Sequence, residues 1–256
     1  MPDDVVLITG ANNGIGLGLA RALSAEGYRV AAFDLSGENL PGVRFFRCDV
    51  TQMPQVASCV EAVIADWGRI DILVNNACLA VFASFEDRHM EEIRREFEVN
   101  YFGYLNLVTA VLPFMKAQGR GIIHNVSSGV GLSGFPGLSG YASAKGAIEA
   151  FTRTLALELK PSGIVVNLMH PPLTRTKSSA PLGIPARFMA DPEEVGRKLA
   201  KQIRSTKAVV TPSRAESLGV FMARVFPLAM GKFFAGRTAA VRTEANNQPS
   251  GNSRKR

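Results

Sequence analysis

Short apolar runs alternate along the chain with stretches that have the periodicity of a helix. The runs occupy residues 5–8, 30–33, 72–74, 121–126 and 164–168. A continuous apolar run bounded by turn residues is typical of a parallel strand that is buried on both faces. The alternation of such runs with helices predicts an α/β fold, in which helices cover both sides of a doubly wound parallel sheet.

The helical stretches have recognisable beginnings and ends. We expect the first helix to begin near Gly14 and to end at Gly27, because apolar residues recur four apart between them. A second helix follows Met53-Pro54, with apolar residues at positions 56, 60, 63, 64 and 67. Residues 90–117 and 141–160 are predicted to form two long helices. Residues 34–44 leave too little chain for another complete helix.

The composition indicates one folded domain. The chain has 256 residues, of which 46% are hydrophobic and 20% charged, which excludes a disordered or collagen-like protein. We expect a single domain over residues 1–215, a helical extension over 216–245 and a disordered tail over 246–256. The spacing of Cys48, Cys59 and Cys78 suits neither a disulfide framework nor a zinc site, so we expect reduced thiols. Because no leader-like segment follows Met1, we expect a cytoplasmic location.

Positive charge is concentrated toward the C-terminus. The chain has 29 Lys and Arg against 22 Asp and Glu. Residues 197–256 contain 13 of the basic and 2 of the acidic residues, which leaves 16 basic and 20 acidic residues before them. No nucleic-acid-reading motif accompanies the basic end, and neither His124 nor His170 has the spacing of a metal ligand. We therefore expect neither a nucleic-acid partner nor a metal site.

A glycine-rich loop, TGANNGIG at residues 9–16, joins the first predicted strand to the first helix. Glycines let the backbone turn tightly and approach a pyrophosphate, while the start of the helix offers free N–H groups. An ordinary turn can have this composition. The position of three glycines directly after a buried strand favours dinucleotide binding in a Rossmann-type fold.

Asp34 is the candidate for choosing between the two dinucleotides. It ends the second predicted strand, 18 residues after Gly16, where a carboxylate can bind the ribose 2′-hydroxyl of NAD. A 2′-phosphate would be repelled by Asp34, and Asn13 and Leu35 carry no positive charge. The alternative is an aspartate that only caps the following turn. We expect NAD as the cofactor, used at least about tenfold better than NADP.

Tyr141 and Lys145 lie four residues apart in a predicted helix and therefore project from the same face. A nearby ammonium favours the phenolate, so we expect Lys145 to lower the pKa of Tyr141 from about 10 toward neutrality. Tyr141 could then exchange a proton with a carbonyl or alcohol oxygen. A Tyr and a Lys at this spacing usually form a surface pair, and the glycine-rich loop in the same chain is what favours the catalytic interpretation.

Together these motifs resemble the short-chain dehydrogenase/reductase family, in its short single-domain branch. The resemblance rests on residues 9–16, on Asn75-Asn76-Ala77, on the spacing from Ser128 to Tyr141, and on Tyr141-x-x-x-Lys145, and it covers about residues 5–205. The combination is specific, although no single motif in it is. The family resemblance implies hydride transfer between a nicotinamide and an alcohol or ketone.

The resemblance implies roles for four catalytic residues. Ser128 matches the serine that hydrogen-bonds the substrate oxygen, and Tyr141 matches the acid or base. Lys145 is the electrostatic partner of Tyr141 and binds the nicotinamide ribose. Asn100 matches the asparagine that holds a water in the proton path to Lys145.

The resemblance also implies a cofactor site. Asp49 matches the carboxylate that meets the adenine, Asn76 lies beside the adenosine ribose, and Thr176 binds the carboxamide. The complete set of implied cofactor-binding residues is Gly10, Asn13, Gly14, Ile15, Gly16, Asp34, Asp49, Val50, Asn76, Tyr141, Lys145, Pro171 and Thr176.

Two residues depart from the family pattern. Cys78 stands where a glycine usually passes the cofactor, and Pro172 replaces the glycine after Pro171. Pro172 stiffens the turn that opens the substrate loop. Cys78 can be a reactive thiol or a small packed side chain, and we favour the packed side chain because no base or cation lies nearby in the sequence.

The C-terminal region is apolar and basic. After an expected strand at residues 209–212, residues 218–236 contain four phenylalanines interrupted by Arg224, Pro227 and Lys232. This segment is too interrupted for a membrane span. We favour helices that cover the substrate cleft or form a dimer contact. The alternative is an apolar, basic surface that contacts anionic membranes.

The sequence as a whole predicts an NAD(H)-dependent oxidoreductase acting on a secondary alcohol or ketone. Residues 171–176 are similar to a segment of ketosphinganine reductases, and residues 177–190 should form a lid with apolar side chains, which suggests a lipid- or steroid-like substrate. The two long helices should form a homodimer or homotetramer, as the resemblance implies. The alternative from another class is a catalytically silent NAD-binding sensor or scaffold protein. An epimerase or dehydratase is disfavoured because little chain remains for a separate substrate domain.

Overall fold

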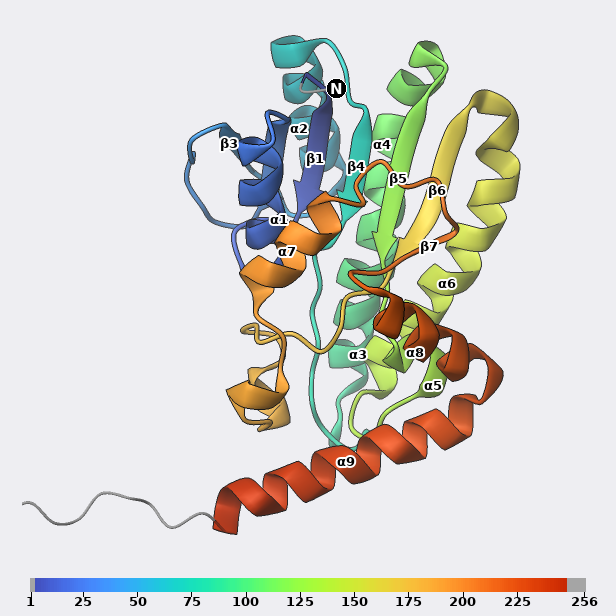
Figure 1. Ribbon diagram of the computed structural model, residues 1–256. Helices are drawn as coiled ribbons and strands as arrows, with labels where there is room; N and C mark the ends of the chain where they lie inside the picture. Colours follow the sequence, from blue (N-terminus) through green and yellow to red (C-terminus); the bar gives the residue numbers. More distant parts are fainter. Residues whose placement is uncertain (1–2, 248–256) are drawn as a thin grey trace, which may run out of the picture.

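A parallel sheet forms the centre of the molecule. The computed structural model describes residues 3–247 and contains a seven-stranded sheet in the order β3-β2-β1-β4-β5-β6-β7 (Figure 1). The strands are β1 (Val5–Thr9), β2 (Arg29–Asp34), β3 (Val43–Arg47), β4 (Ile72–Asn75), β5 (Gly121–Val126), β6 (Ile164–Met169) and β7 (Val209–Val210). The expected doubly wound sheet is confirmed. Its order reverses between β1 and β4, and ligands bind at the carboxyl ends of strands at such a point.

Strand β3 is the one strand that the apolar pattern does not predict. It pairs with β2 alone and forms the edge of the sheet. Val43 is buried, whereas Arg44 and Arg47 are exposed. An edge strand can carry charged side chains, so its sequence lacks the continuous apolar run of the inner strands.

Helices cover both faces of the sheet, as expected. The α-helices are α1 (Gly14–Ala25), α2 (Met53–Trp67), α3 (Met90–Phe97), α4 (Gly103–Gln118), α5 (Val130–Ser133), α6 (Ser139–Leu159), α7 (Pro192–Ala200), α8 (Arg214–Val225) and α9 (Pro227–Asn247). Single 3₁₀ turns are η1 (Phe85–Asp87), η3 (Lys160–Ser162), η4 (Ala180–Leu182) and η5 (Ala186–Phe188), and η2 (Glu98–Phe102) is a π-helical turn.

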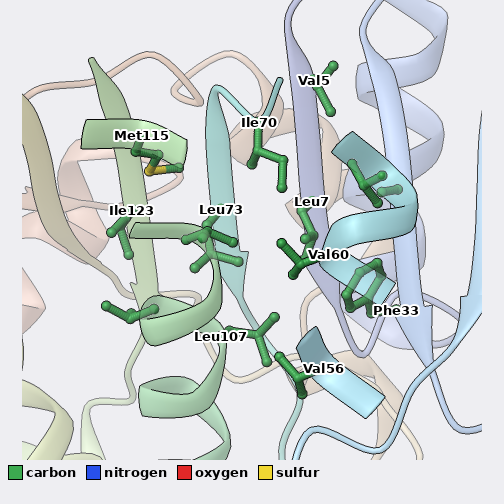
Figure 2. Packing of buried hydrophobic residues seen from close by; sticks show 14 of the residues in the cluster. Val5, Leu7, Phe33, Val56, Val60, Ile70, Leu73, Leu107, Met115 and Ile123 are labelled. Atoms are coloured by element: carbon green, nitrogen blue, oxygen red, sulfur yellow. The ribbon is translucent and has the colours of Figure 1, made fainter. Parts of the chain in front are cut away.

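The alternation of side chains along β1 divides the core into two layers. Leu7 lies in the cluster beneath α2, α4 and α6, where it packs with residues such as Val60 and Leu107 (Figure 2). Ile8 points the other way, into the cluster that includes Leu19 of α1 and other residues of α1 and α7. Both faces of the strand are therefore buried, which explains its continuous apolar sequence.

The predicted helix at residues 90–117 is interrupted by a π-helical turn. Helix α3 passes through η2 into α4, so that one extra residue is accommodated within a continuous helical path. Asn100 lies in this turn and is fully buried. A π-helical turn of this kind often marks a functional position, and no periodicity in the sequence indicated it.

Two helices follow the sheet at the C-terminus. Helices α8 and α9 lie at the end of the molecule toward which the strand arrows point, and α9 runs across that end (Figure 1). Asn246 and Asn247, expected in a disordered tail, belong to α9. The rest of the expected tail, residues 248–256, lies outside the described residues. The division of the chain at residues 215 and 245 stays a prediction.

Candidate active site

The glycine loop forms a cradle in which side chains would collide with the surrounding backbone. Gly10 has φ +65°, and a Cβ there would lie 2.8 Å from the Cα of Ala77. A Cβ on Gly16 would lie 2.2 Å from the carbonyl oxygen of Gly10. Only glycine is compatible with both positions. The loop thus keeps its backbone accessible at the start of α1.

The start of α1 provides hydrogen-bond donors for an anion. Asn13 is the N-cap, and its side chain makes no capping hydrogen bond. Ile15 packs against the α1 face of the core. A Cβ on Gly14, which has φ +52°, would lie 2.8 Å from Cγ2 of Thr176, so the segment after β6 reaches this loop. The glycines, the uncapped helix start and the nearby Thr176 fit a dinucleotide pyrophosphate and nicotinamide.

Asp34 lies at the end of β2 and binds backbone groups. Its Oδ2 accepts a hydrogen bond from the N–H of Asn12 at 2.9 Å, and its Oδ1 accepts one from the N–H of Leu35 at 2.8 Å. Asp34 therefore does cap the turn after β2, which was the alternative interpretation of its place in the sequence. Because Asn12 belongs to the glycine loop, Asp34 also stands beside the expected cofactor position, and its role toward the ribose stays a prediction.

Arg47 is a basic residue near Asp34 that the sequence analysis missed. It lies opposite Asp34 in the pairing of β2 with β3. A cavity of about 630 Å³ adjoins this edge of the sheet and is lined by Leu35, Arg47, Asp49, Pro54, Gln55, Ser58 and Cys59. Asp49 is thus placed at this cavity, although its Oδ1 also accepts hydrogen bonds from Thr51. An exposed guanidinium in this position could bind a phosphate.

Asn76 and Val50 support neighbouring segments. The Asn76 amide donates to the carbonyl oxygens of Thr9 and Gly10, at 2.9 and 3.1 Å. This contact holds the end of β4 against the glycine loop. Val50 is buried, and its carbonyl oxygen accepts a hydrogen bond from Asn106 of α4 at 2.9 Å. Their expected contacts with the adenosine remain predictions.

Ser128, Tyr141 and Lys145 come together at the carboxyl end of β5. Ser128 lies two residues after the end of β5, and the other two residues lie in the first turns of α6. Ser128 hydrogen-bonds with the Tyr141 side chain. The ammonium nitrogen of Lys145 lies 5.6 Å from the centroid of the Tyr141 ring. The structure therefore places the three expected catalytic side chains in one cluster.

The expected lowering of the Tyr141 pKa is wrong for the protein without cofactor. Burial raises the pKa of this phenol, and the Cys78 thiol and the Glu96 carboxylate raise it further. The hydrogen bond with Ser128 lowers the pKa but does not reverse the shift. Tyr141 is consequently a neutral phenol at pH 7 and a proton donor. The sequence shows the nearby cation, whereas the burial of the phenol appears only in the folded structure.

Lys145 is held by Tyr104, which the sequence analysis did not identify. Its Nζ donates to the hydroxyl of Tyr104 at 2.9 Å and to the carbonyl oxygen of Val126 at 2.8 Å. The same nitrogen lies 4.8 Å from the centroid of the Tyr104 ring. Burial lowers the pKa of Lys145 to about 8, against a smaller opposing effect of Cys78. The ammonium is thus directed toward the end of β5, beneath the Tyr141 ring.

Asn100 stands one helical turn before Tyr104. Its side-chain oxygen accepts from the N–H of Leu79 at 2.9 Å, and its amide donates to the Leu79 carbonyl at 2.7 Å. The side chain therefore holds the segment after β4 with both of its polar atoms. Its expected place in the proton path is not shown by these contacts.

Glu149, one turn beyond Lys145 on α6, joins several segments around the site. Its carboxylate lies 2.7 Å from Nε2 of His170 and 3.0 Å from a guanidinium nitrogen of Arg224 in α8. Burial alone would raise the pKa of Glu149, but the adjacent side chains of His170 and Ser127 and the charge of Arg224 lower it. Ser127 precedes Ser128 and His170 precedes Pro171. The ionised carboxylate of Glu149 therefore connects α8 to the ends of β5 and β6.

The segment after β6 leads from the cofactor loop into the expected lid. The Thr174 hydroxyl donates to the carbonyl oxygen of Pro172 at 2.8 Å, and a bridge from Thr174 to Ala190 closes the base of the segment. Thr176 binds Ser179 within it. Pro171 thus begins a loop that starts beside Glu149 and returns to α7. Binding of the carboxamide by Thr176 stays a prediction.

Cys78 differs from the packed side chain that we favoured. It is exposed, and its thiol influences the pKa values of Tyr141 and Lys145. The fold brings it near a buried cation that is 67 residues away in the sequence. The residues next to Cys78 in the sequence therefore did not indicate that Tyr141 and Lys145 lie near it in the fold.

The buried Lys145 predicts a pH-dependent stability. The unfolded chain keeps a proton on this lysine up to about pH 10.5, whereas the folded protein releases it near pH 8. Between these values the unfolded state binds more protons, so stability rises with pH. Relative to Lys145→Met, the free energy of unfolding of the unsubstituted protein should rise by up to about 3 kcal/mol. Urea unfolding at several pH values measures the difference, and a constant difference would contradict the shift.

Removal of the Tyr104 hydroxyl should destabilise the charged form of Lys145 relative to its neutral form. In Tyr104→Phe the ring remains while the hydrogen-bond acceptor is lost, so the pKa of Lys145 should fall below about 8. The pH-dependent rise in stability should then begin at a lower pH. Tyr101→Phe, the same change on the neighbouring η2, is the matched control. Identical pH profiles for the two variants would show that Tyr104 does not hold the ammonium.

The chain is similar to known oxidoreductases over most of its length. Residues 4–184 match the family model described as short chain dehydrogenase. A 3-ketodihydrosphingosine reductase of Bacteroides thetaiotaomicron is 38% identical over 67% of this chain and 64% of its own length. A 3-alpha-(or 20-beta)-hydroxysteroid dehydrogenase of Mycobacterium bovis is 37% identical over 67% of this chain and 69% of its own length.

A solved structure that holds a nicotinamide cofactor has a similar fold. The 3-ketoacyl-(acyl-carrier-protein) reductase of Brucella melitensis, complexed with NADH, has a TM-score of 0.73 at 26% identity and covers 83% of this chain and 98% of its own. Together with the glycine cradle and the cluster of Ser128, Tyr141 and Lys145, these matches show that the chain belongs to the short-chain dehydrogenase/reductase family.

Proposed function

We propose that the protein is an NAD(H)-dependent oxidoreductase that interconverts a secondary alcohol and a ketone on an apolar, lipid- or steroid-like substrate. The observation that supports this most is the gathering of Ser128, Tyr141 and Lys145 at the same carboxyl edge of the sheet as the glycine cradle. The names of the two relatives point to a long-chain ketone and to steroid alcohols. Both substrates carry an oxygen on a large apolar body.

The chemistry would divide between cofactor and protein as follows. The bound nicotinamide supplies or accepts the hydride. Tyr141, a neutral phenol, donates its proton to the substrate oxygen during reduction, and Ser128 holds that oxygen by a hydrogen bond. Lys145 places a positive charge beneath the phenol and stabilises the phenolate that remains. Asn100, one turn from Tyr104, would lie in the path by which protons return to Lys145.

The cofactor would bind along the carboxyl ends of β1, β2 and β4. Gly10, Gly14 and Gly16 leave room for the pyrophosphate, and the N-terminus of α1 offers it N–H donors. Asp34, Asp49, Val50 and Asn76 would surround the adenosine. Pro171 and Thr176 would position the nicotinamide end.

Exposed apolar side chains near α4 and α6 support an oligomer, and the free cysteines support a reducing compartment. Helices α4 and α6 would form the contact of a homodimer or homotetramer, since Phe102 and Leu157 are exposed on this part of the molecule. All three cysteines are free. Free thiols suit a reducing compartment, and we propose the cytoplasm.

A catalytic role for Tyr141 separates an enzyme from a silent NAD-binding protein. Steroid, sterol, acyl and polyol alcohols and ketones are followed by NADH absorbance, and the apolar compounds should react faster than the polyols. With the best of them, Tyr141→Phe should lower kcat by about 10²–10⁴-fold, because the proton donor is lost. NADH binding, measured by fluorescence, should be retained. Unchanged turnover in this variant would exclude the proposed acid.

The cofactor preference tests the opposing charges of Asp34 and Arg47. NAD(H) should give a kcat/KM at least about tenfold higher than NADP(H), because Asp34 would repel a 2′-phosphate. In Asp34→Ser the guanidinium of Arg47 remains, so the preference should narrow or reverse. Asp34→Ser with Arg47→Gln should use NADP(H) less well than Asp34→Ser alone. Equal efficiency of the unsubstituted protein with both cofactors would reject the proposed preference.

A further inference from the structure

Exposed apolar side chains are concentrated on the C-terminal helices. Among the described residues, fourteen large hydrophobic side chains are exposed, and seven of them lie between positions 218 and 234. These seven are Leu218, Phe221, Val225, Phe226, Leu228, Phe233 and Phe234, and we call them the α8–α9 apolar surface. A concentration of this kind marks a binding surface more often than single exposed residues do. The covering of the substrate cleft or a dimer contact by these helices, which the sequence favoured, stays a prediction.

Both helices expose several of their apolar side chains, whereas Val220, Met222 and Met230 are half-buried. On α8, Ala223 is buried, whereas Leu218, Phe221 and Val225 recur at helical spacing on the exposed side. On α9, Gly231 approaches the carbonyl oxygen of Ser133 so closely that a Cβ would lie 2.5 Å from it. Phe233, two residues later, is directed away from this contact and is exposed.

The apolar surface is fixed at the catalytic end of the protein. Arg224 of α8 pairs with the buried carboxylate of Glu149 in α6. Ser133, against which α9 packs, ends the short helix that follows Ser128. The lid segment at residues 177–190 lies at this same end, together with the exposed Phe188 (Figure 1).

The charged side chains around this surface have one sign. On α8 and on the described side chains of α9, the exposed charged residues are Arg214, Arg224, Lys232 and Arg237, and of these Arg224 is already paired with Glu149. Glu216 is the acidic residue of α8 and is only partly exposed. Lys232 and Arg237 flank Phe233 along α9. Exposed aromatic and aliphatic side chains can insert among lipid headgroups, and basic residues beside them are attracted to an anionic bilayer.

We propose that the α8–α9 apolar surface docks on anionic lipid membranes, with Leu228 and Phe233 inserted among the headgroups and the basic residues against the lipid phosphates. A second copy of the chain is a less suitable occupant. A two-fold dimer through this surface would bring the same basic residues face to face, and such like-charge contacts are costly. No helix among residues 3–247 is long and apolar enough to cross a membrane.

Docking in this orientation has a consequence for the reaction. The lid and the ends of β5 and β6 would face the bilayer, so a lipophilic alcohol or ketone could enter without crossing water. This consequence rests on the proposed function, whereas the membrane contact does not. Binding to vesicles is therefore measured without substrate or turnover.

The test is co-sedimentation of the full chain with phosphatidylcholine vesicles that contain or lack phosphatidylserine. The unsubstituted protein should bind the anionic vesicles at low salt and dissociate as salt screens the basic residues. Leu228→Ser combined with Phe233→Ser should weaken partition by at least about tenfold. Lys232→Gln combined with Arg237→Gln should weaken partition several-fold on anionic vesicles and change little on neutral ones.

Leu157→Ser is the matched control. Leu157 is 76% exposed, against 77% for Leu228, and it lies near the end of α6 that is remote from α9 (Figure 1). Because Leu157 also lies on the proposed subunit contact, this variant should bind vesicles as the unsubstituted protein does when both have the same assembly state. Thermal unfolding and NADH binding of each variant show that it is folded, and mass photometry gives its assembly state, so that species of equal size are compared.

Three results would overturn the proposal. One is failure of the unsubstituted protein to bind anionic vesicles at low salt. Another is equal loss of binding in the Leu228/Phe233 variant and in Leu157→Ser. The third is an oligomer that dissociates on substitution of Leu228 and Phe233 while vesicle binding is unchanged, which would make this surface an interface between copies. Loss of vesicle binding with unchanged turnover of a soluble alcohol leaves the proposed enzyme intact.

Discussion

The site depends on a buried ammonium group that is held by two neutral oxygen atoms. Lys145 donates to the Tyr104 hydroxyl and to the Val126 carbonyl, and the low polarity of its surroundings brings its pKa down to about 8. A cation in this position is costly to desolvate, so the surrounding structure must hold it firmly. The end of β5 provides one acceptor, and the helix that follows the π-helical turn provides the other. Tyr141 then lies with its ring over the charge.

Two buried carboxylates, Glu96 and Glu149, lie around the cluster of Ser128, Tyr141 and Lys145. Glu96 pairs with Arg88 and accepts from the N–H of Val81, and its charge raises the pKa of Tyr141. Glu149 pairs with His170 and Arg224 and so connects α6, the end of β6 and α8. Glu96 thereby adds to the effect of burial, which is the main reason that the pKa of Tyr141 is raised and the phenol stays protonated. The C-terminal helices are also tied to the catalytic cluster, which makes their outward apolar surface part of the same end of the molecule.

Much of the fold and part of the site could be predicted from sequence because local patterns determine them. The continuous apolar run of β1, the glycines before α1 and the four-residue spacing of Tyr141 and Lys145 are each set by neighbours in the chain. The edge strand β3 was missed because Arg44 and Arg47 interrupt its apolar pattern. Tyr104, Arg47 and Glu149 could not be assigned because their partners are distant in the sequence. The direction of the Tyr141 pKa shift was wrong because burial, which only the folded structure reveals, outweighs the neighbouring cation.

The most direct measurement concerns the ionisation of Lys145 itself. Nitrogen-15 NMR of the lysine side chains, with Lys145→Met to assign the signal, gives the pKa of this ammonium in the folded protein without cofactor. The structure predicts a pKa of about 8, with a signal protected from exchange by its contacts with Tyr104 and Val126. A pKa at the ordinary value of 10.5, with rapid exchange, would show that the ammonium lies in solvent and that the catalytic cluster described above does not form.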